Sequence, residues 1–161
     1  MKTLLLVRHA KAVPDAPPLP DRDRPLDERG LLDAPKMGKR LAQRDLKPDL
    51  IVTSPARRAL TTAQLIGDEI GADRRDIAID GRLYASSAGE LLAVIRALDT
   101  TFDQVMLVGH NPEFTELAHR LSNQITEMPT CAVAEFGFDI EAWSAVGDVA
   151  PSKVRLDEPK A

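Results

Sequence analysis

The sequence contains very little cysteine, because Cys131 is the only one among 161 residues. A single cysteine cannot form an internal disulfide, and Cys131 lacks the neighbouring ligands that a cysteine-based metal site requires. A chain without disulfides suits a reducing compartment. We therefore expect a cytoplasmic protein.

The sequence also lacks an excess of positive charge and a long apolar run. Its 21 Lys and Arg residues are outnumbered by 25 Asp and Glu, which gives a net charge of −4 and disfavours a general affinity for nucleic acid. The first apolar run extends only from Leu4 to Val7 and stops at Arg8. Because this run is too short to direct export or to span a bilayer, we expect a buried strand and no membrane association.

Length and composition indicate one domain over residues 1–161. The chain has 43% hydrophobic and 29% charged residues, which is typical of a globular protein of this size. The acidic balance and the lack of a long exposed apolar stripe are compatible with a monomer.

Short apolar runs alternate with segments of helical spacing. This alternation predicts an α/β fold with a mostly parallel sheet flanked by helices. The predicted strands are residues 4–7, 50–52 and 105–108, and the predicted helices are residues 32–44, 56–70, 90–98 and 114–121. Residues 132–140 and 143–146 alternate weakly and predict an added C-terminal strand pair, after which residues 157–161 are expected to fray.

Residues 13–25 contain five prolines, too many for a helix or a central strand. This segment is predicted to be a loop. Long loops in compact domains often cover sites, so the loop is either a lid over a pocket or a plain connector.

Polar residues follow all three predicted strands. Arg8 and His9 end the first strand, Ser54 to Arg58 follow the second, and Gly109 to Asn111 follow the third. Ligands of parallel sheets bind beyond the carboxyl ends of the strands, so these groups are expected to meet. The sequence therefore predicts one shared pocket.

Two of these segments also predict helix starts. Ser54-Pro55 and Asn111-Pro112 each place a capping side chain before a proline, which is typical of a helix N-terminus. Helix N-termini favour anions, phosphate above all, and a bound anion would offset the placement of Arg58 in a first turn, where a cation is disfavoured. For Arg57 we retain the simpler interpretation of a solvated surface residue.

His9 taken alone is more often a structural histidine than a catalytic one. Its neighbours favour a role in phosphoryl transfer, since Arg8 precedes it and His110 ends another strand. Zinc is disfavoured, because two histidines lack a third ligand and the adjacent arginines would repel the cation. We expect no metal and no cofactor. His119 lies mid-helix without such neighbours and is predicted to be a surface residue.

Together these segments resemble the histidine phosphatase superfamily, which has a three-layer phosphoglycerate-mutase-like fold. The short length, the segment Asp23 to Leu26 and the segment Gly109 to Pro112 resemble the SixA-type phosphohistidine phosphatases in particular. The motifs that carry the wider resemblance are Leu6-Val7-Arg8-His9-Ala10, Ser54-Pro55-Ala56-Arg57-Arg58-Ala59-Leu60-Thr61-Thr62-Ala63 and Gly109-His110-Asn111.

This resemblance implies that His9 is the nucleophile that becomes phosphorylated, and that Arg8, Arg58 and His110 surround the phosphate. His9 must be neutral to attack, whereas a cationic His110 would better stabilise the developing charge, so the two are expected to favour different protonation states. Ala10 replaces the signature glycine and is small enough to fit unless the backbone is strongly strained.

Larger members of the superfamily carry a carboxylic acid that protonates the leaving group, and no acid is clearly in register here. Glu90 and Glu113 are possible acids, but either can equally be a favourable first-turn residue. Asp21 and Asp23 in the proline-rich loop are further options.

A missing acid favours phosphohistidine, because an imidazole leaves with less help than an alkoxide. The expected partner is then a phosphorylated protein, such as a phosphohistidine phosphotransfer domain, and the product is inorganic phosphate. Two alternatives stay open. One is a phosphatase for small phosphate esters, and the other is a non-catalytic phosphate-binding module.

Overall fold

The computed structural model describes residues 1–16 and 18–160, which form a layered α/β fold. Its six strands are β1 (Lys2–Arg8), β2 (Leu50–Thr53), β3 (Ala78–Ile79), β4 (Gln104–Gly109), β5 (Val133–Phe138) and β6 (Lys153–Asp157). They form one sheet in the order β3-β2-β4-β1-β5-β6. The first four strands are parallel to one another, and β5 and β6 are antiparallel to their neighbours. The predicted mostly parallel sheet is confirmed.

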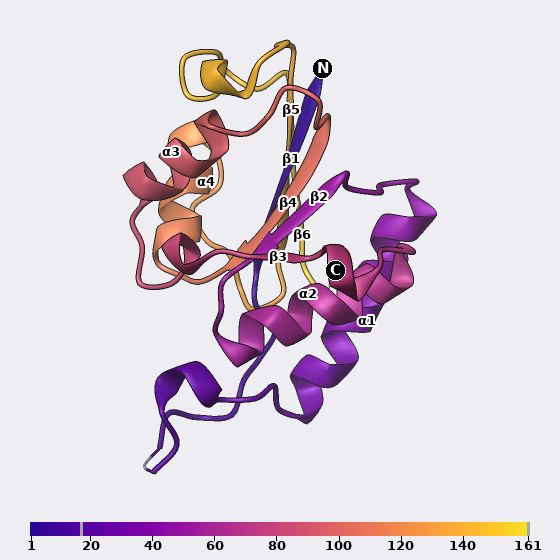
Figure 1. Ribbon diagram of the computed structural model, residues 1–161, viewed down its shortest axis with the longest axis vertical. Helices are drawn as coiled ribbons and strands as arrows, with labels where there is room; N and C mark the ends of the chain where they lie inside the picture. Colours follow the sequence, from indigo (N-terminus) through magenta and orange to yellow (C-terminus); the bar gives the residue numbers. More distant parts are fainter. Residues whose placement is uncertain (17, 161) are drawn as a thin grey trace.

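Helices cover both faces of this sheet. They are α1 (Glu28–Gln43), α2 (Arg57–Glu69), α3 (Ala88–Arg96) and α4 (Glu113–Ser122). The helices α1 and α2 lie on one side of the sheet, and α3 and α4 lie on the other (Figure 1). This arrangement gives the three layers that the sequence predicts. No helix formed by the described residues combines the length and the apolar character needed to cross a bilayer.

The place of β1 inside the sheet explains why its residues 4–7 are all apolar. Successive side chains of a strand point to opposite faces, so Leu4 and Leu6 pack with α3 and α4, whereas Leu5 and Val7 pack with α1 and α2. All four side chains are fully buried. A strand covered on both faces needs no polar alternation, and the run ends where the chain leaves the core at Arg8.

The predicted C-terminal strand pair is half right. Residues 133–138 form β5, but the segment predicted as its partner, residues 143–146, begins with a 3-10 turn at Trp143–Ala145. Its apolar side chains are buried in a different way, since Trp143 packs in the core and its indole N–H donates to the Phe102 carbonyl at 2.8 Å. The second strand of the C-terminal pair is β6, which lies on the side of β5 away from β1 and which the sequence pattern missed.

The predicted fraying of residues 157–161 is wrong for residues 157–160. The Nζ of Lys36 donates to the Pro159 carbonyl at 2.6 Å, and the guanidinium of Arg40 donates to the carbonyls of Glu158 and Pro159. Two long cations on α1 therefore tie the tail to the body of the protein. Residue 161 lies outside the described residues.

Both predicted helix starts are displaced along the chain. The N-cap of α2 is Ala56 and that of α4 is Pro112, so neither Ser54 nor Asn111 occupies the cap position. Their side chains still bind the first turns, because Ser54 Oγ accepts from the Ala56 amide at 3.1 Å and Asn111 Oδ1 accepts from the Thr115 amide at 3.2 Å. The helices nonetheless begin just beyond β2 and β4, as expected.

Candidate active site

The end of β1 holds Arg8 and His9 rigidly. Arg8 pairs with Gly109 of β4, and the His9 amide donates to the Gly109 carbonyl at 2.9 Å. On the other side, the Cys131 amide donates to the His9 carbonyl at 3.0 Å. The Ala10 amide donates to Thr62 Oγ1 at 2.9 Å, which ties this strand end to α2. Backbone bonds on every side therefore fix the position of the His9 side chain.

The His9 ring is oriented by a hydrogen bond at one of its nitrogens. Nδ1 lies 2.7 Å from the Ala10 carbonyl oxygen. Since a carbonyl only accepts, Nδ1 carries the proton and donates, and the lone pair of neutral His9 is on Nε2. Burial, assisted by the nearby charges of Arg58, Arg8 and Arg24, lowers the pKa of His9 to about 4. At neutral pH the His9 ring is uncharged.

The start of α2 contributes Arg58. Its guanidinium is buried, and its backbone carbonyl accepts from Thr62 Oγ1 at 2.7 Å, the same hydroxyl that accepts from the Ala10 amide. Thr62 therefore joins the two elements that carry Arg58 and His9. Arg57 is exposed, as predicted for a surface residue.

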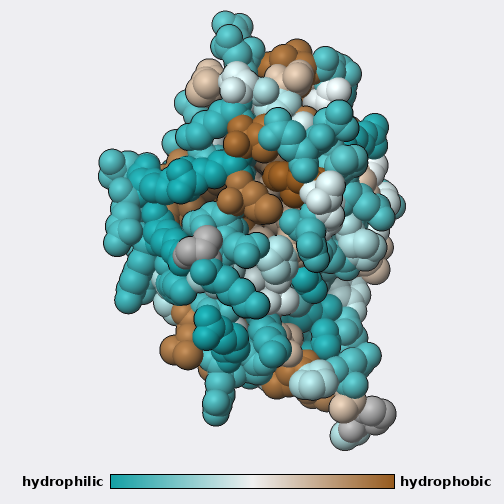
Figure 2. All heavy atoms as spheres, turned by 180° about the vertical axis from the view of Figure 1, so that it is seen from behind, coloured by the Kyte–Doolittle hydropathy of each residue, from teal (hydrophilic) through white to brown (hydrophobic). Residues whose placement is uncertain are grey.

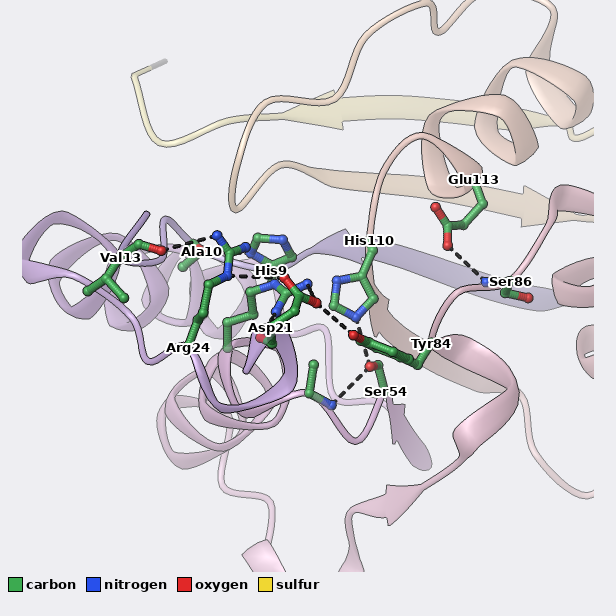
Figure 3. Close-up of polar contacts among 12 residues, drawn as sticks. His9, Ala10, Val13, Asp21, Arg24, Ser54, Tyr84, Ser86, His110 and Glu113 are labelled. Carbon is green, nitrogen blue, oxygen red and sulfur yellow. Dashed lines mark hydrogen bonds and ion pairs between the residues drawn. The ribbon is translucent and has the colours of Figure 1, made fainter. Parts of the chain in front are cut away.

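The end of β4 contributes His110, whose ring centroid lies 5.2 Å from that of His9 (Figure 3). The residue before His110 must be glycine for α4 to pack this closely, because a Cβ on Gly109 would come within 2.4 Å of the Phe114 ring. His110 Nε2 lies 2.8 Å from Ser54 Oγ. Burial, together with the neighbouring His9 and Arg58, lowers the pKa of His110 to about 3. Both rings are thus neutral at pH 7, so the different protonation states that the chemistry would favour are not seen here.

Ser54 defines which nitrogen of His110 can bind a ligand. Ser54 Oγ already accepts from the Ala56 amide, so its own hydrogen is free to be donated to His110 Nε2. A donating Ser54 leaves the proton of neutral His110 on Nδ1, which is buried, has no hydrogen-bond partner among the described residues and faces the His9 side of the site (Figure 3).

Buried nitrogens without partners gather in this region. Among residues 1–16 and 18–160, the buried side-chain nitrogens that lack both a hydrogen bond and an ion pair are Arg8 Nε, Arg58 Nε and His110 Nδ1. Native proteins rarely leave such donors unpaired, so an unpaired cluster indicates a missing acceptor. Donors supplied mainly by arginine suit a phosphate-like oxyanion. His9 and His110 lie beside each other, and the charges of Arg8 and Arg58 are near enough to lower the pKa of His9.

The two predicted acids are both hydrogen-bonded to Ser86. Glu113 is buried, and its Oε2 accepts from the Ser86 amide at 3.2 Å (Figure 3). Glu90 is exposed and bonded to Ser86 Oγ at 3.1 Å. His119 is exposed as predicted, with Nδ1 3.1 Å from the Ile125 carbonyl.

The carboxylate that does reach the site is Asp21, from the proline-rich loop. It accepts from Tyr84 Oη at 2.7 Å and from Arg58 Nη2 at 3.1 Å. These bonds hold the pKa of Asp21 below its usual range, the Tyr84 hydrogen bond having the largest effect. Asp21 is therefore ionised at neutral pH. Asp23, in the same turn, makes no such contact.

Sequence reasoning missed Thr62, Ser54 and Tyr84. Thr62 and Ser54 lie inside the motif from Ser54 to Ala63. Their spacing from Arg58 in the sequence could therefore have marked them as site residues. Tyr84 carried no such signal, because it follows no strand and its place beside His110, with ring centroids 5.5 Å apart, depends on tertiary packing.

A groove of about 1130 Å³ lies next to the site, between Lys11, the segment 124–130 and β6. Figure 2 shows a mostly hydrophilic back face on which hydrophobic atoms gather near the middle. None of the four predicted site residues lines this groove.

Among the described residues, no group of three or more His, Cys, Asp or Glu side chains is placed to hold a metal ion.

Histidine and arginine side chains beyond the ends of parallel strands are the groups that phosphoryl transfer uses. Residues 4–94 match the model of the histidine phosphatase superfamily (branch 1). The chain belongs to this superfamily and is a phosphatase.

Relatives of known sequence and structure agree with this family. An uncharacterized chloroplastic protein of Arabidopsis thaliana is 29% identical, covering 93% of this chain and 78% of its own. A structure from Agrobacterium tumefaciens, assigned as the phosphohistidine phosphatase SixA, has a TM-score of 0.78 and 31% identity, with 84% of this chain and 90% of that chain covered. A structure from Nakamurella multipartitia with the same assignment has a TM-score of 0.84 and 24% identity, covering 99% and 97%, and it shows the same fold.

The low pKa of His9 predicts a broad pH profile. The predicted nucleophile His9 must be neutral to attack, so kcat/KM is expected to stay level with respect to this group from pH 8 down to about 5 and to fall about tenfold per pH unit below its pKa of about 4. A pH-rate profile, with circular dichroism at each pH to verify the fold, measures this. A fall beginning near pH 6.5 would mean that His9 has an unshifted pKa in the free enzyme.

Replacing Ser54 tests the orientation of His110. Ser54→Ala removes the hydroxyl that holds His110 Nε2, so we expect kcat to fall about tenfold because the Nδ1 proton is no longer fixed. Thr53→Ser is a matched control, because Thr53 Oγ1 bonds only the Ser54 carbonyl and a serine keeps that hydroxyl. If Ser54→Ala keeps wild-type kcat, Ser54 does not set the His110 tautomer.

Proposed function

We propose that this phosphatase works through a covalent phosphohistidine at His9, without a metal ion. One observation carries the proposal. The Nδ1 proton of His9 leaves the lone pair on Nε2, and buried donors of Arg8, Arg58 and His110 lack a hydrogen-bond partner. This combination supports a neutral nucleophile acting beside donors that suit a phosphoryl oxyanion. The positively charged arginine side chains would repel a metal ion and stabilise phosphate.

The reaction has two steps. Nε2 of His9 attacks phosphorus, the N–P bond forms, and the bond to the leaving group breaks with its electron pair going to that group. Arg8, Arg58 and His110 bind the non-bridging oxygens, whose charge they stabilise. Water then attacks phosphorus opposite Nε2, which returns neutral His9 and releases inorganic phosphate after losing a proton to solvent.

The proposed substrate is phosphohistidine on a protein. An alkoxide leaving group needs a proton from a carboxylic acid, yet Glu113 and Glu90 are bonded to Ser86, and Asp21 is ionised because its pKa is lowered. An imidazole protonated by solvent leaves as a neutral base and needs no such acid. The resemblance to proteins assigned as SixA adds support.

Relative rates on three substrate classes test this substrate. We expect kcat/KM to be highest for a phosphohistidine-containing phosphotransfer domain, lower for an aryl phosphate and lowest for a sugar phosphate. Comparable rates for the sugar phosphate and phosphohistidine would favour the alternative of a small-ester phosphatase with a carboxylic acid. The family is one of phosphatases, which disfavours a non-catalytic module. The cytoplasmic location and the monomeric state stay predictions.

A further inference from the structure

The short turn Asp21–Asp23 is held against the candidate site by Arg58 and Tyr84. The Asp21 carbonyl accepts from Arg58 Nη1 at 2.7 Å, and its carboxylate accepts from Arg58 Nη2 at 3.1 Å. Tyr84 Oη donates to the same carboxylate oxygen at 2.7 Å. One residue of the loop thus occupies both terminal nitrogens of a phosphate-binding arginine.

The neighbouring arginines strengthen this contact. Arg24 Nε lies 3.2 Å from the other Asp21 carboxylate oxygen, and Arg24 Nη1 donates to the Val13 carbonyl at 3.2 Å. Arg22 places its guanidinium 5.3 Å from the centroid of the Tyr84 ring, within reach of a cation–π contact. The turn is therefore fastened to both Arg58 and the Tyr84 loop.

We propose that the Asp21 carboxylate occupies, on Arg58, the place that a phosphoryl oxygen takes in the complex, and so sets the affinity of the site for phosphate by competing with it. Two oxygens on the terminal nitrogens of a planar guanidinium are the arrangement in which arginine binds phosphate. Only Nε of Arg58 has no partner in this structure. This inference rests on the proposed role of Arg58.

The competition follows from charge. A phosphate that reaches Arg58 meets an anionic carboxylate on the same guanidinium, so either Asp21 moves away or two anions share one cation at a cost. When the phosphoryl group leaves as inorganic phosphate, Asp21 can take its place again without exposing Arg58 to solvent. A low affinity for the product is the expected benefit.

Equilibrium binding of inorganic phosphate tests the proposal. Isothermal titration calorimetry on the full chain compares the wild type with Asp21→Asn, which keeps the size of the side chain and removes its charge. We expect Asp21→Asn to bind phosphate at least about tenfold more tightly, because a charge within a few ångströms of the anion is removed. Asp23→Asn is the matched control, since it changes the same charge in the same turn without touching Arg58, and it is expected to stay within about twofold.

Equal or weaker binding by Asp21→Asn would overturn the proposal, because Asp21 would then only position Arg58. Tyr84→Phe gives a second test if Asp21→Asn does not fold. It keeps the charge but loses the bond that holds Asp21, so tighter phosphate binding supports competition and unchanged or weaker binding contradicts it. Equilibrium binding needs no covalent step, so a missing phosphoenzyme would count against the proposed function alone.

Discussion

Replacing His9 by Ala is expected to lower kcat/KM by at least about a thousandfold, because the only proposed nucleophile is lost while the anion-binding donors stay. The rest of the site should persist, since His9 is held by its backbone bonds to Gly109 and Cys131 rather than by its ring. Steady-state rates on a phosphohistidine substrate measure the loss. Circular dichroism of the variant verifies the fold.

His119→Ala is the matched control for this variant. His119 is exposed on α4, and its ring is hydrogen-bonded to the Ile125 carbonyl outside the site, so its removal should leave kcat/KM within about twofold of the wild type. A His9→Ala variant that turns over at the wild-type rate would rule out covalent catalysis at His9. His110 would then be the remaining histidine at the site.

Replacing Arg58 by Ala is expected to lower kcat by about 10² to 10³, the usual effect of removing one donor to a developing oxyanion. Arg58 is buried at the start of α2 with its side chain in the site, whereas Arg57 beside it is exposed. Arg57→Ala is therefore a control that makes the same substitution one residue away, and we expect less than a twofold change.

The conservative variant Arg58→Lys separates charge from geometry. Lysine keeps the positive charge but cannot reproduce the planar fork that Asp21 now occupies, so only a small part of the activity should return. Full recovery with lysine would mean that Arg58 acts as a point charge. Equal losses in Arg57→Ala and Arg58→Ala would instead place the phosphate outside the position described above.

The strand ends were predictable from sequence because the physical signal is local. A buried parallel strand such as β1 is an apolar run, and the polar residue that ends it marks where the chain reaches solvent. Three such boundaries predicted that Arg8, Arg58 and His110 would meet His9. The sheet topology then brought them together, since β1 and β2 both pair with β4.

The edge strand β6 could not be predicted in the same way. Three of its five residues are exposed, and charged side chains at Lys153 and Arg155 give it the composition of a loop. Its pairing with β5 depends on contacts made across the folded structure. Glu135 of β5, for example, forms an ion pair with Lys153 at 3.0 Å.

The contact of Asp21 with Arg58 was equally hidden. Asp21 and Asp23 lie in the same turn and are indistinguishable by residue type and neighbourhood, yet only Asp21 reaches the site. Tyr84 joins them from a loop far along the chain. Such relations depend on tertiary placement, and no spacing in the sequence encodes them.

The central claim is that a phosphoryl group is carried on His9, and trapping the phosphoenzyme tests it most directly. The protein is mixed with a ³²P-labelled phosphoryl donor, quenched rapidly in alkali, and digested for mass spectrometry. We predict an alkali-stable, acid-labile label on the peptide that contains His9, absent in His9→Ala and retained in His119→Ala. A fully active enzyme that carries no label, or a label on another residue, would contradict the account.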